Sequence, residues 1–290
     1  MSSYAVVTPA RNEAANLPRL AAALAAQTLR PTAWVVVEDG STDDTVAVVE
    51  RLASEHDFVL LAPRSADAGA GLARGRREGR ALEGFRSGVR ALPGPVDVVI
   101  KIDADVDFDP DYLESLVGRF QDDPRLGIAS GTCYEQEGGA WVRRTKSDTT
   151  VWGASRAYRW DCIADVMALE PRMGWDGLDE LRVHLRGYTT ATFVDLPFRH
   201  HRSEGGREHS RLHHGEALGR ASWYMGYRPS YLLLRALYRA RREPAALAMV
   251  WGYGVAAVRR EPRCPDSRVI AVLRDRQRLR ASLRRGAPVS

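Results

Sequence analysis

The segment PVDVVIKIDADVDFDPDYLE, residues 95–114, decides the predicted fold. It opens with an apolar, β-branched run that is short enough to form a buried strand. Asp109 and Pro110 then predict the start of a helix, as its N-cap and its first residue. Asp103 and Asp105 therefore fall in the loop at the carboxyl end of a strand, where open α/β sheets bind ligands.

Asp103 and Asp105 form a pair of acids separated by one alanine. Carboxylate oxygens of this kind hold hard divalent cations, with phosphate oxygens completing the shell. Asp is also a common turn and cap former, so the alternative is that the pair simply closes the loop after the strand. Taken alone, the motif leaves a metal site and a structural role equally open.

The chain has 290 residues, enough for one large domain with an extension. Its three cysteines, Cys133, Cys162 and Cys264, are scattered and lack metal-ligand spacing, so we expect no disulfide framework. The N-terminus shows no secretory signal, and no apolar run reaches the roughly 18 residues of a membrane span. These features favour a cytoplasmic protein without a transmembrane helix.

The net charge of +5 conceals an asymmetry along the chain. Residues 199–290 carry 20 Lys and Arg against 7 Asp and Glu, whereas residues 1–198 carry 22 against 30. Nearly all of the cations are arginines, and the lysines are Lys101 and Lys146. A basic segment favours an anionic partner such as a membrane surface or a polyphosphate.

The first third of the chain alternates strand and helix signals. We predict strands at 4–8, 34–37 and 59–62, with helices at 16–28 and 43–53 between them. This βαβαβ order predicts a largely parallel, doubly wound sheet. A Gly- and Arg-rich stretch follows, and we expect it to form a loop and then a helix.

The second half changes character. Residues 126–200 mix strand and helix signals, and Gly187 ends the last predicted helix of this part. The final segment combines Trp, Tyr and Leu with Arg in helical patterns. Such helices suit a membrane interface, and packing on the globular part or on a second subunit is the alternative. We therefore predict a domain over residues 1–204 and a basic, aromatic-rich helical extension over residues 205–290.

Three stretches carry a family resemblance: VVTPARNEAANLPRLAAALAAQT, VVVEDGSTDDT and IKIDADVDFDPDYLE. In this order and spacing they resemble the inverting family 2 glycosyltransferases of GT-A fold, over residues 4–200. The resemblance implies an α/β fold with a Rossmann-like, mixed and mostly parallel sheet flanked by helices. It also implies transfer of a sugar from a nucleotide-diphosphate donor to an acceptor hydroxyl, with Mg²⁺ or Mn²⁺ as cofactor. The basic extension lies outside the resemblance.

The same resemblance implies roles for particular residues. Asp105 would ligate the metal, and Asp103 would contact the ribose or the metal, with Asp107 less favoured as a ligand. The first strand and the turn after the second would line the nucleoside pocket, where Asp39 would accept a hydrogen bond from the base. The other residues implied for this pocket are Thr8, Pro9, Arg11 and Glu13.

Arginine and histidine side chains complete the implied site. A guanidinium matches phosphate geometry, so an arginine of the 74–80 stretch could approach the diphosphate. We favour Arg80 over Arg74 and Arg77, because Gly79-Arg80-Ala81 resembles the Gly-basic-Ala segment of many family members. His200 and His201 follow a strand-like segment, and the resemblance implies that one of them is a further metal ligand. The alternative is that these two histidines cap a loop over the diphosphate or belong to the acceptor site.

An inverting transfer requires a base that deprotonates the acceptor hydroxyl. By resemblance this base lies on a helix that ends at a glycine, and the matching position before Gly187 is Asp176. In the family a glutamate precedes this aspartate, whereas Trp175 stands here. Asp179 and Glu180 are therefore competing carboxylates.

The expected partners are a UDP-, GDP- or dTDP-sugar donor and a saccharide, lipid-linked or small-molecule acceptor. Contact with the inner face of the plasma membrane and a homodimer are open alternatives, and nucleic acid is not expected. Two other functions compete: a non-catalytic module that binds nucleic acid or anionic membrane through the Arg-rich extension, and a nucleotidyltransferase. The acid pair argues against the first, and the lack of a Gly-rich, Lys-bearing phosphate loop near the N-terminus argues against the second.

Overall fold

The computed structural model describes residues 2–63, 77–144, 150–201, 211–241 and 243–278. Arg74, one of the arginines considered for the diphosphate, lies outside the described residues. The side chain of Arg77 lies outside them as well.

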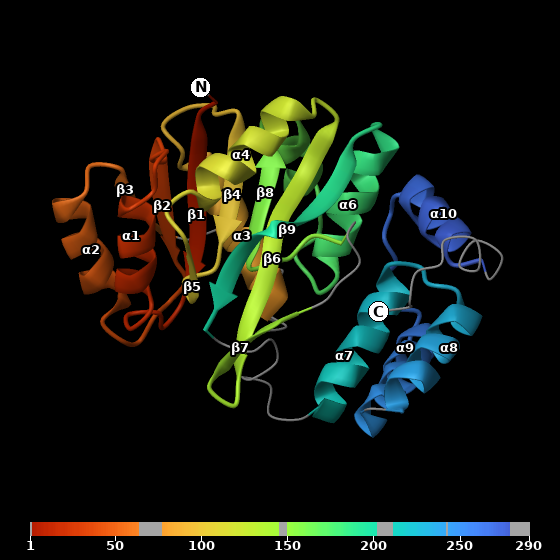
Figure 1. Ribbon diagram of the computed structural model, residues 1–290. Helices are drawn as coiled ribbons and strands as arrows, with labels where there is room; N and C mark the ends of the chain where they lie inside the picture. The colour runs from red at the N-terminus through yellow and green to blue at the C-terminus, as the bar shows by residue number, and fades with distance from the viewer. Residues whose placement is uncertain (1, 64–76, 145–149, 202–210, 242, 279–290) are drawn as a thin grey trace. The chain divides into compact units, whose positions relative to one another are not determined.

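One mixed sheet forms the centre of the N-terminal part (Figure 1). Its strands lie in the order β3-β2-β1-β4-β8-β6-β9-β5, and β7 pairs with β6. Their bounds are β1 Tyr4–Ala10, β2 Ala33–Glu38, β3 Val59–Pro63, β4 Val98–Ile102, β5 Val106–Phe108, β6 Leu126–Glu137, β7 Ala140–Arg143, β8 Ser155–Arg159 and β9 Thr189–His200. Strands β1 to β4 run parallel, and β8 is antiparallel to both β4 and β6. Because β9 is parallel to β6, it runs in the same direction as β1 to β4, and the predicted mixed, mostly parallel sheet is confirmed.

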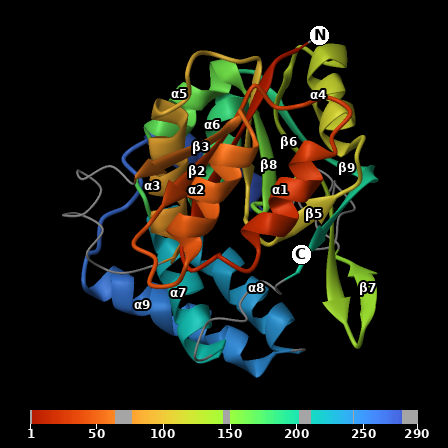
Figure 2. The same cartoon turned by 90° about the vertical axis from the view of Figure 1, so that its left-hand side faces the viewer.

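The two faces of this sheet carry different helices (Figure 2). Successive side chains of a strand point to opposite faces. Val6 and Val36 accordingly share a core with residues of α1, α2 and α4, whereas Val7 and Val37 face Gly88 of α3. The helices of this part are α1 Leu17–Ala25, α2 Thr45–Glu55, α3 Arg77–Arg90, α4 Tyr112–Asp122, the 3-10 turn η2 Trp160–Cys162 and α5 Ile163–Met167.

The predicted start of α4 is wrong by two residues. The helix begins at Tyr112 with Asp111 as its N-cap, so Asp109 lies before the helix. The Asp109 carboxylate accepts a hydrogen bond from Arg199 of β9 at 2.9 Å. The Asp109 carboxylate is held by this strand and does not cap the helix. A long-range ion pair therefore accounts for a helix that starts two residues later than local sequence preference predicted.

Helix α3 lies close to the sheet because glycines face it. A Cβ atom on Gly88 would lie 2.3 Å from Val7 Cγ1 and 2.9 Å from Val37 Cγ2. A Cβ atom on Gly84 would lie 2.8 Å from Pro9 Cβ. The helix therefore rests on β1 and β2 at a distance that only glycine allows.

The chain divides into two compact units. The first comprises residues 1–171 and 186–203, and the second comprises residues 172–185 and 204–290. The second unit thus contains the predicted extension together with a segment that lies within the predicted first domain. A domain boundary at residue 204 stays our prediction for the family domain.

The second unit is helical. Its elements are α6 Trp175–Leu185, α7 Arg211–Tyr224, α8 Pro229–Ala240, the 3-10 turn η3 Pro244–Leu247, α9 Ala248–Val258 and α10 Ser267–Arg276. Helices α7 and α9 pack at backbone distance, since a Cβ atom on Gly219 would lie 2.1 Å from the carbonyl oxygen of Met249. A Cβ atom on Gly252 would lie 2.0 Å from the carbonyl oxygen of Glu216. Among the described residues, no helix is both long and apolar enough to cross a membrane.

The close approach of α3 to β1 gives a stability prediction. Gly88→Ala should lower the free energy of unfolding by about 1–3 kcal/mol, because its methyl group would overlap Val7. This loss should outweigh the roughly 0.5–1 kcal/mol that Ala gains over Gly within a helix. Urea unfolding followed by circular dichroism measures the change. Gly94→Ala is the control, since a Cβ there meets no atom within 4 Å; equal stability of the two variants would contradict the packing of α3.

Candidate functional site

The acid pair lies in the short loop between β4 and β5. Asp103 directly follows β4, and Asp105 directly precedes β5. Strand β5 is antiparallel to the end of β9, with Val106 opposite His200. Strand β9 is also parallel to β6, with Glu135 opposite His200. Segments that are far apart in the sequence therefore meet at this edge of the sheet.

Asp103, Asp105 and His200 form one cluster of candidate metal ligands. Their ligand atoms all lie within 4.8 Å of one another. Asp105 and His200 are buried, and Asp103 is half-buried. Nε2 of His200 lies 3.4 Å from Oδ1 of Asp105. The backbone N–H of His201 donates a hydrogen bond to the Asp105 carbonyl at 2.9 Å, which fixes the loop against the end of β9.

The other ring nitrogen of His200 faces Glu135. Nδ1 lies 3.3 Å from Oε1 of Glu135, and Cys133 belongs to the same group of ligand atoms. Burial alone would lower the pKa of His200, but its interactions with Asp105 and Cys133, and the charges of Asp105 and Asp103, raise this pKa to about 10. The surrounding acids therefore favour positive charge at this position, which either the imidazole proton or a metal ion bound to the neutral imidazole could supply.

His201 is directed to a different acid. Its Nε2 lies 2.5 Å from Oδ2 of Asp107, and Arg199 donates a hydrogen bond to the same carboxylate. Burial alone would raise the pKa of Asp107, but the hydrogen bonds from Arg199 and His201 lower it. The structure thus brings His200, rather than His201, to the acid pair.

A buried lysine contacts Asp103. Lys101 is only 3% exposed, and its Nζ donates hydrogen bonds to Oδ1 of Asp103 and, at 2.8 Å, to the carbonyl oxygen of Gly153. Lys101 was not among the site residues predicted from the sequence. The sequence feature that could have singled out Lys101 is the rarity of lysine, because Lys101 is one of two lysines in a chain whose other basic residues with fixed charge are arginines.

The residues implied for the donor lie at the carboxyl ends of β1 and β2. Asp39 follows β2, and its backbone N–H donates a hydrogen bond to the carbonyl of Ala10 at 3.0 Å. Nε of Arg80, from α3, lies 4.0 Å from Oδ2 of Asp39. Arg11 is exposed and Pro9 is half-buried. Asp39 and Arg80 thus meet although they come from different elements.

Thr8 and Glu13 make hydrogen bonds to other residues of the protein beside the end of β1. The Thr8 hydroxyl is fully buried and accepts a hydrogen bond from Trp34 Nε1 at 3.0 Å. Glu13 accepts a hydrogen bond from Asn16 at 2.7 Å, and its backbone N–H donates to the Thr45 hydroxyl at 2.9 Å. Both side chains are therefore engaged with the protein, and their contacts with a donor stay predictions.

The three candidate bases lie on α6 of the second unit. Asp176 is exposed in the first turn of the helix. Asp179 is fully buried, and its Oδ1 accepts the backbone N–H of Glu180 at 2.6 Å. Glu180 is half-buried. Among these three carboxylates, Asp176 is the most accessible to a molecule that arrives from solvent.

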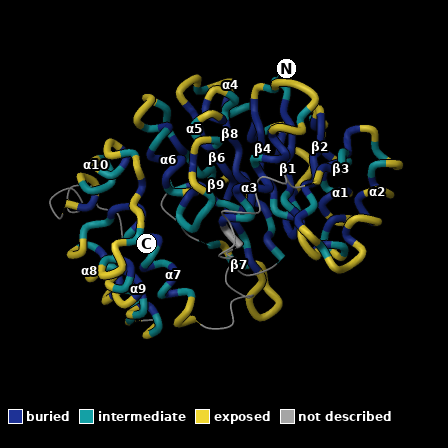
Figure 3. Tube along the Cα trace, turned by 180° about the vertical axis from the view of Figure 1, so that it is seen from behind, coloured by how far each residue is buried: buried dark blue, intermediate teal, exposed yellow. Residues whose placement is uncertain are grey.

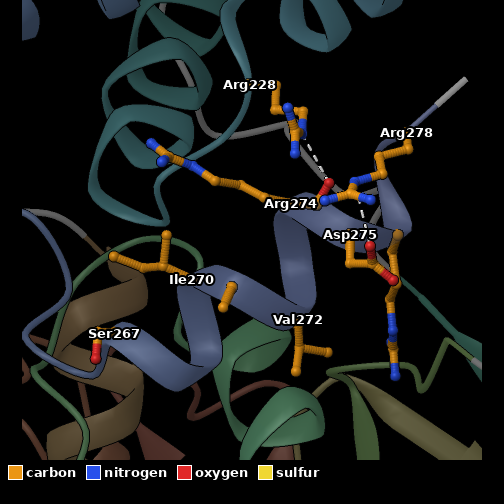
Figure 4. Close-up of a pocket in the computed structure, with 9 residues that line it drawn as sticks. Arg228, Ser267, Ile270, Val272, Arg274, Asp275 and Arg278 are labelled. Carbon is orange, nitrogen blue, oxygen red and sulfur yellow. Dashed lines mark hydrogen bonds and ion pairs between the residues drawn. The ribbon is translucent and has the colours of Figure 1, made fainter.

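A cavity of about 850 Å³ lies in the second unit along α10 (Figure 4). Arg228 Nε donates to the carbonyl of Arg274 at 2.7 Å, and Arg274 Nε donates to the carbonyl of Gly226 at 2.8 Å. Arg278 lies 3.2 Å from Asp275. Figure 4 shows the side chain of Arg274 pointing away from Arg228 and Arg278. Because these arginines diverge and are engaged with backbone or with Asp275, the cavity is not our candidate active site.

The donor set of the acid cluster fits a divalent metal ion. Two carboxylates and one imidazole offer the oxygen and nitrogen atoms that suit Mg²⁺ or Mn²⁺. Nε2 of His200 is buried and makes no hydrogen bond to any described residue. A metal ion held between His200 and the acid pair would satisfy this nitrogen.

Comparison with known structures supports a glycosyltransferase fold. The structure is similar to mannosyltransferase PcManGT from Pyrobaculum calidifontis in complex with GDP-Man and Mn²⁺, with a TM-score of 0.58, 16% identity and coverage of 98% of this chain and 84% of that one. It is also similar to S. aureus TarS 1-349 in complex with UDP-GlcNAc, with a TM-score of 0.55, 16% identity and coverage of 76% and 65%. Glucosyl-3-phosphoglycerate synthase from Mycobacterium tuberculosis, with Mn²⁺, UDP and phosphoglyceric acid, matches with a TM-score of 0.51, 17% identity and coverage of 70% and 72%. The expected GT-A fold is thus confirmed.

The family assignment rests on the sequence itself. The family described as glycosyl transferase family 2 matches residues 5–169, a span that holds the opening strand, the turn after β2 and the acid pair. This match covers more than half of the chain, and the motifs that it spans are the ones that predicted the family. The protein therefore belongs to glycosyl transferase family 2.

Proposed function

We propose that the protein transfers a sugar from a nucleotide-diphosphate sugar to an acceptor hydroxyl, with inversion at the anomeric carbon and with dependence on Mg²⁺ or Mn²⁺. The cluster of Asp103, Asp105 and His200 at the carboxyl end of β4 carries this proposal. Open α/β sheets bind their ligands at this edge. The similar structures that hold GDP-Man with Mn²⁺, or UDP with Mn²⁺, support the same ligand classes here.

In this proposal Asp105 and His200 hold the metal ion, and Asp103 contacts the ribose or serves as a third ligand. When bound, the metal supplies Lewis-acid stabilisation of the charge on the departing diphosphate. Lys101 keeps the Asp103 carboxylate oriented through the hydrogen bond to its Oδ1. We propose His200 in preference to His201, because His201 is engaged with Asp107.

The donor nucleotide is proposed to lie against the ends of β1 and β2. Asp39 would accept a hydrogen bond from the base, and Arg80 would contact the diphosphate. The proximity of these two side chains, 4.0 Å between Arg80 Nε and Asp39 Oδ2, supports a shared donor pocket. The remaining residues proposed for this pocket are Thr8, Pro9, Arg11 and Glu13.

Asp176 is the proposed base. It would take the proton from the acceptor hydroxyl as that oxygen attacks the anomeric carbon on the face opposite the diphosphate. A base must reach a group that enters from solvent, and exposure favours Asp176 over the fully buried Asp179. The proposed acceptor is a saccharide, lipid-linked or small-molecule hydroxyl, met in the cytoplasm at the inner face of the plasma membrane.

The metal-dependent donor site can be tested by thermal stabilisation. A panel of UDP-, GDP- and dTDP-sugars should raise the melting temperature of the wild type for one nucleotide class, and only with Mn²⁺ or Mg²⁺, since binding to the native state stabilises it by mass action. Asp105→Asn should lose this metal-dependent shift. Asp111→Asn is the control, because Asp111 is exposed and makes no side-chain cap hydrogen bond. Equal shifts in wild type and Asp105→Asn would remove Asp105 from the metal site.

The base assignment can be tested by separating binding from transfer. Asp176→Asn should reduce the rate of sugar transfer by about 10²–10⁴-fold, the range that a general base contributes, and should leave donor affinity unchanged. Titration calorimetry measures affinity, and release of the nucleoside diphosphate measures the rate. Asp179→Asn is the matched comparison on the same helix. A loss of transfer in Asp179→Asn with full activity in Asp176→Asn would move the base to the buried acid.

Lys101 is predicted to act as a positioning residue. Lys101→Met should weaken Mn²⁺-dependent nucleotide binding by about 10–100-fold, as loss of a group that orients a ligand commonly does. Titration calorimetry at a temperature well below the melting midpoint of the variant separates this effect from unfolding. A folded Lys101→Met protein with wild-type affinity for Mn²⁺ and nucleotide would show that the contact with Asp103 does not serve the site.

A further inference from the structure

Helix α8 turns its apolar face outward. Its inner side contributes only Leu232 and Ala236 to a small cluster with Met249 and Tyr253 of α9. The opposite side carries four large apolar side chains at i, i+1, i+4 and i+5 spacing, which places them on one face of a helix. They are 46–51% exposed: Leu233, Leu234, Leu237 and Tyr238. The helix is amphipathic, but its larger apolar face is the exposed one (Figure 3).

Helix α9 repeats this arrangement. Its sequence AMVWGYGVAAV contains no charged residue, so it has no polar face to turn to water. The exposed apolar side chains of α9 form a stripe along one face, from the residue before the helix to its last residue. Trp251 belongs to this stripe and is 68% exposed. Its other members are Leu247, Val250 and Val258. The inward face is filled by α7 at the glycine contact between Gly252 and Glu216, so the stripe is held in position.

Arginines border both stripes. Arg241 follows α8, and Arg259 and Arg260 follow α9, and all three are exposed. The region from residue 199 onward has 20 Lys and Arg against 7 Asp and Glu. An apolar stripe flanked by exposed guanidinium groups matches the boundary between acyl chains and anionic headgroups.

We propose that the outward faces of α8 and α9 bind the surface of an anionic lipid bilayer. Each helix would lie in the interface, with Leu234 and Trp251 among the acyl chains and arginines such as Arg259 on headgroup phosphates. The helices have 12 and 11 residues, which suits an interfacial position and is too short for a span. This surface is independent of the proposed transfer activity, because it involves none of the residues assigned to the donor, the metal or the base.

Co-sedimentation with lipid vesicles tests the proposal without any donor. The full chain should bind vesicles of phosphatidylcholine mixed with phosphatidylglycerol more strongly than vesicles of phosphatidylcholine alone, and added salt should weaken the binding. The double variant Leu234→Gln/Trp251→Gln should bind the anionic vesicles about tenfold less or weaker still, since it loses buried apolar area without a change of charge. Arg259→Gln/Arg260→Gln should reduce the preference for the anionic vesicles.

Val194→Gln is the matched control, because Val194 is 47% exposed and lies on β9, outside both helices. It should bind vesicles as the wild type does, and the circular dichroism of all variants should be unchanged. Wild-type binding by the Leu234→Gln/Trp251→Gln protein would overturn the proposal. So would a wild type that ignores vesicles and forms a dimer in light scattering that these substitutions dissociate, since the stripes would then face a second copy of the chain.

Discussion

Three residues of β5 pair with the last residues of β9, and the position of the acid pair depends on this short ladder. With Val106 opposite His200, the residue before Val106 is Asp105, so carboxylate and imidazole come together from distant parts of the chain. The ladder depends in turn on a register shift between β6 and β9 beside Gly131. A Cβ atom on Gly131 would lie 2.1 Å from the carbonyl oxygen of Leu196, so the strands can pass here only because the side chain is absent. The candidate metal site thus depends on the close approach of β6 and β9 at Gly131, a position away from the metal ligands themselves.

The site also concentrates buried charge, which folding alone does not favour. Asp105 and Glu135 are almost completely buried, and buried carboxylates persist only where cations and hydrogen-bond donors face them. His200 lies between these two acids, and Lys101 meets Asp103. Replacing such pairs by apolar residues is often neutral, whereas removing one partner costs about 3–5 kcal/mol, so the charges are better explained by ligand binding than by stability. The ammonium group of Lys101 is a compact charge, and it donates to one carboxylate oxygen and to one backbone carbonyl.

Local sequence patterns predicted the parts of the fold and of the candidate site that depend on one element at a time. The β-branched run before Asp103 placed the acids at a strand end, since strand, loop and helix signals follow one another there. The partners that come from other strands were harder to predict. Glu135 and Cys133 join the cluster through the register of β6 with β9, and no local pattern specifies that pairing. The start of α4 was misplaced for the same reason, because the ion pair of Asp109 with a β9 residue is a long-range contact.

The second unit shows how packing can force apolar side chains outward. Helix α9 meets α7 at backbone distance on the face that carries Gly252, where a Cβ atom would lie 2.0 Å from the carbonyl oxygen of Glu216. Leu247, Trp251 and Val258 therefore have no place on the α7 side, and their exposure is a consequence of the glycine contact rather than of a loosely held helix. A chain that needed only to bury apolar area would place charged residues on such an outer face. An apolar face that is bordered by arginines, on a helix packed against α7 on its other side, instead suits the proposed binding to an anionic lipid surface.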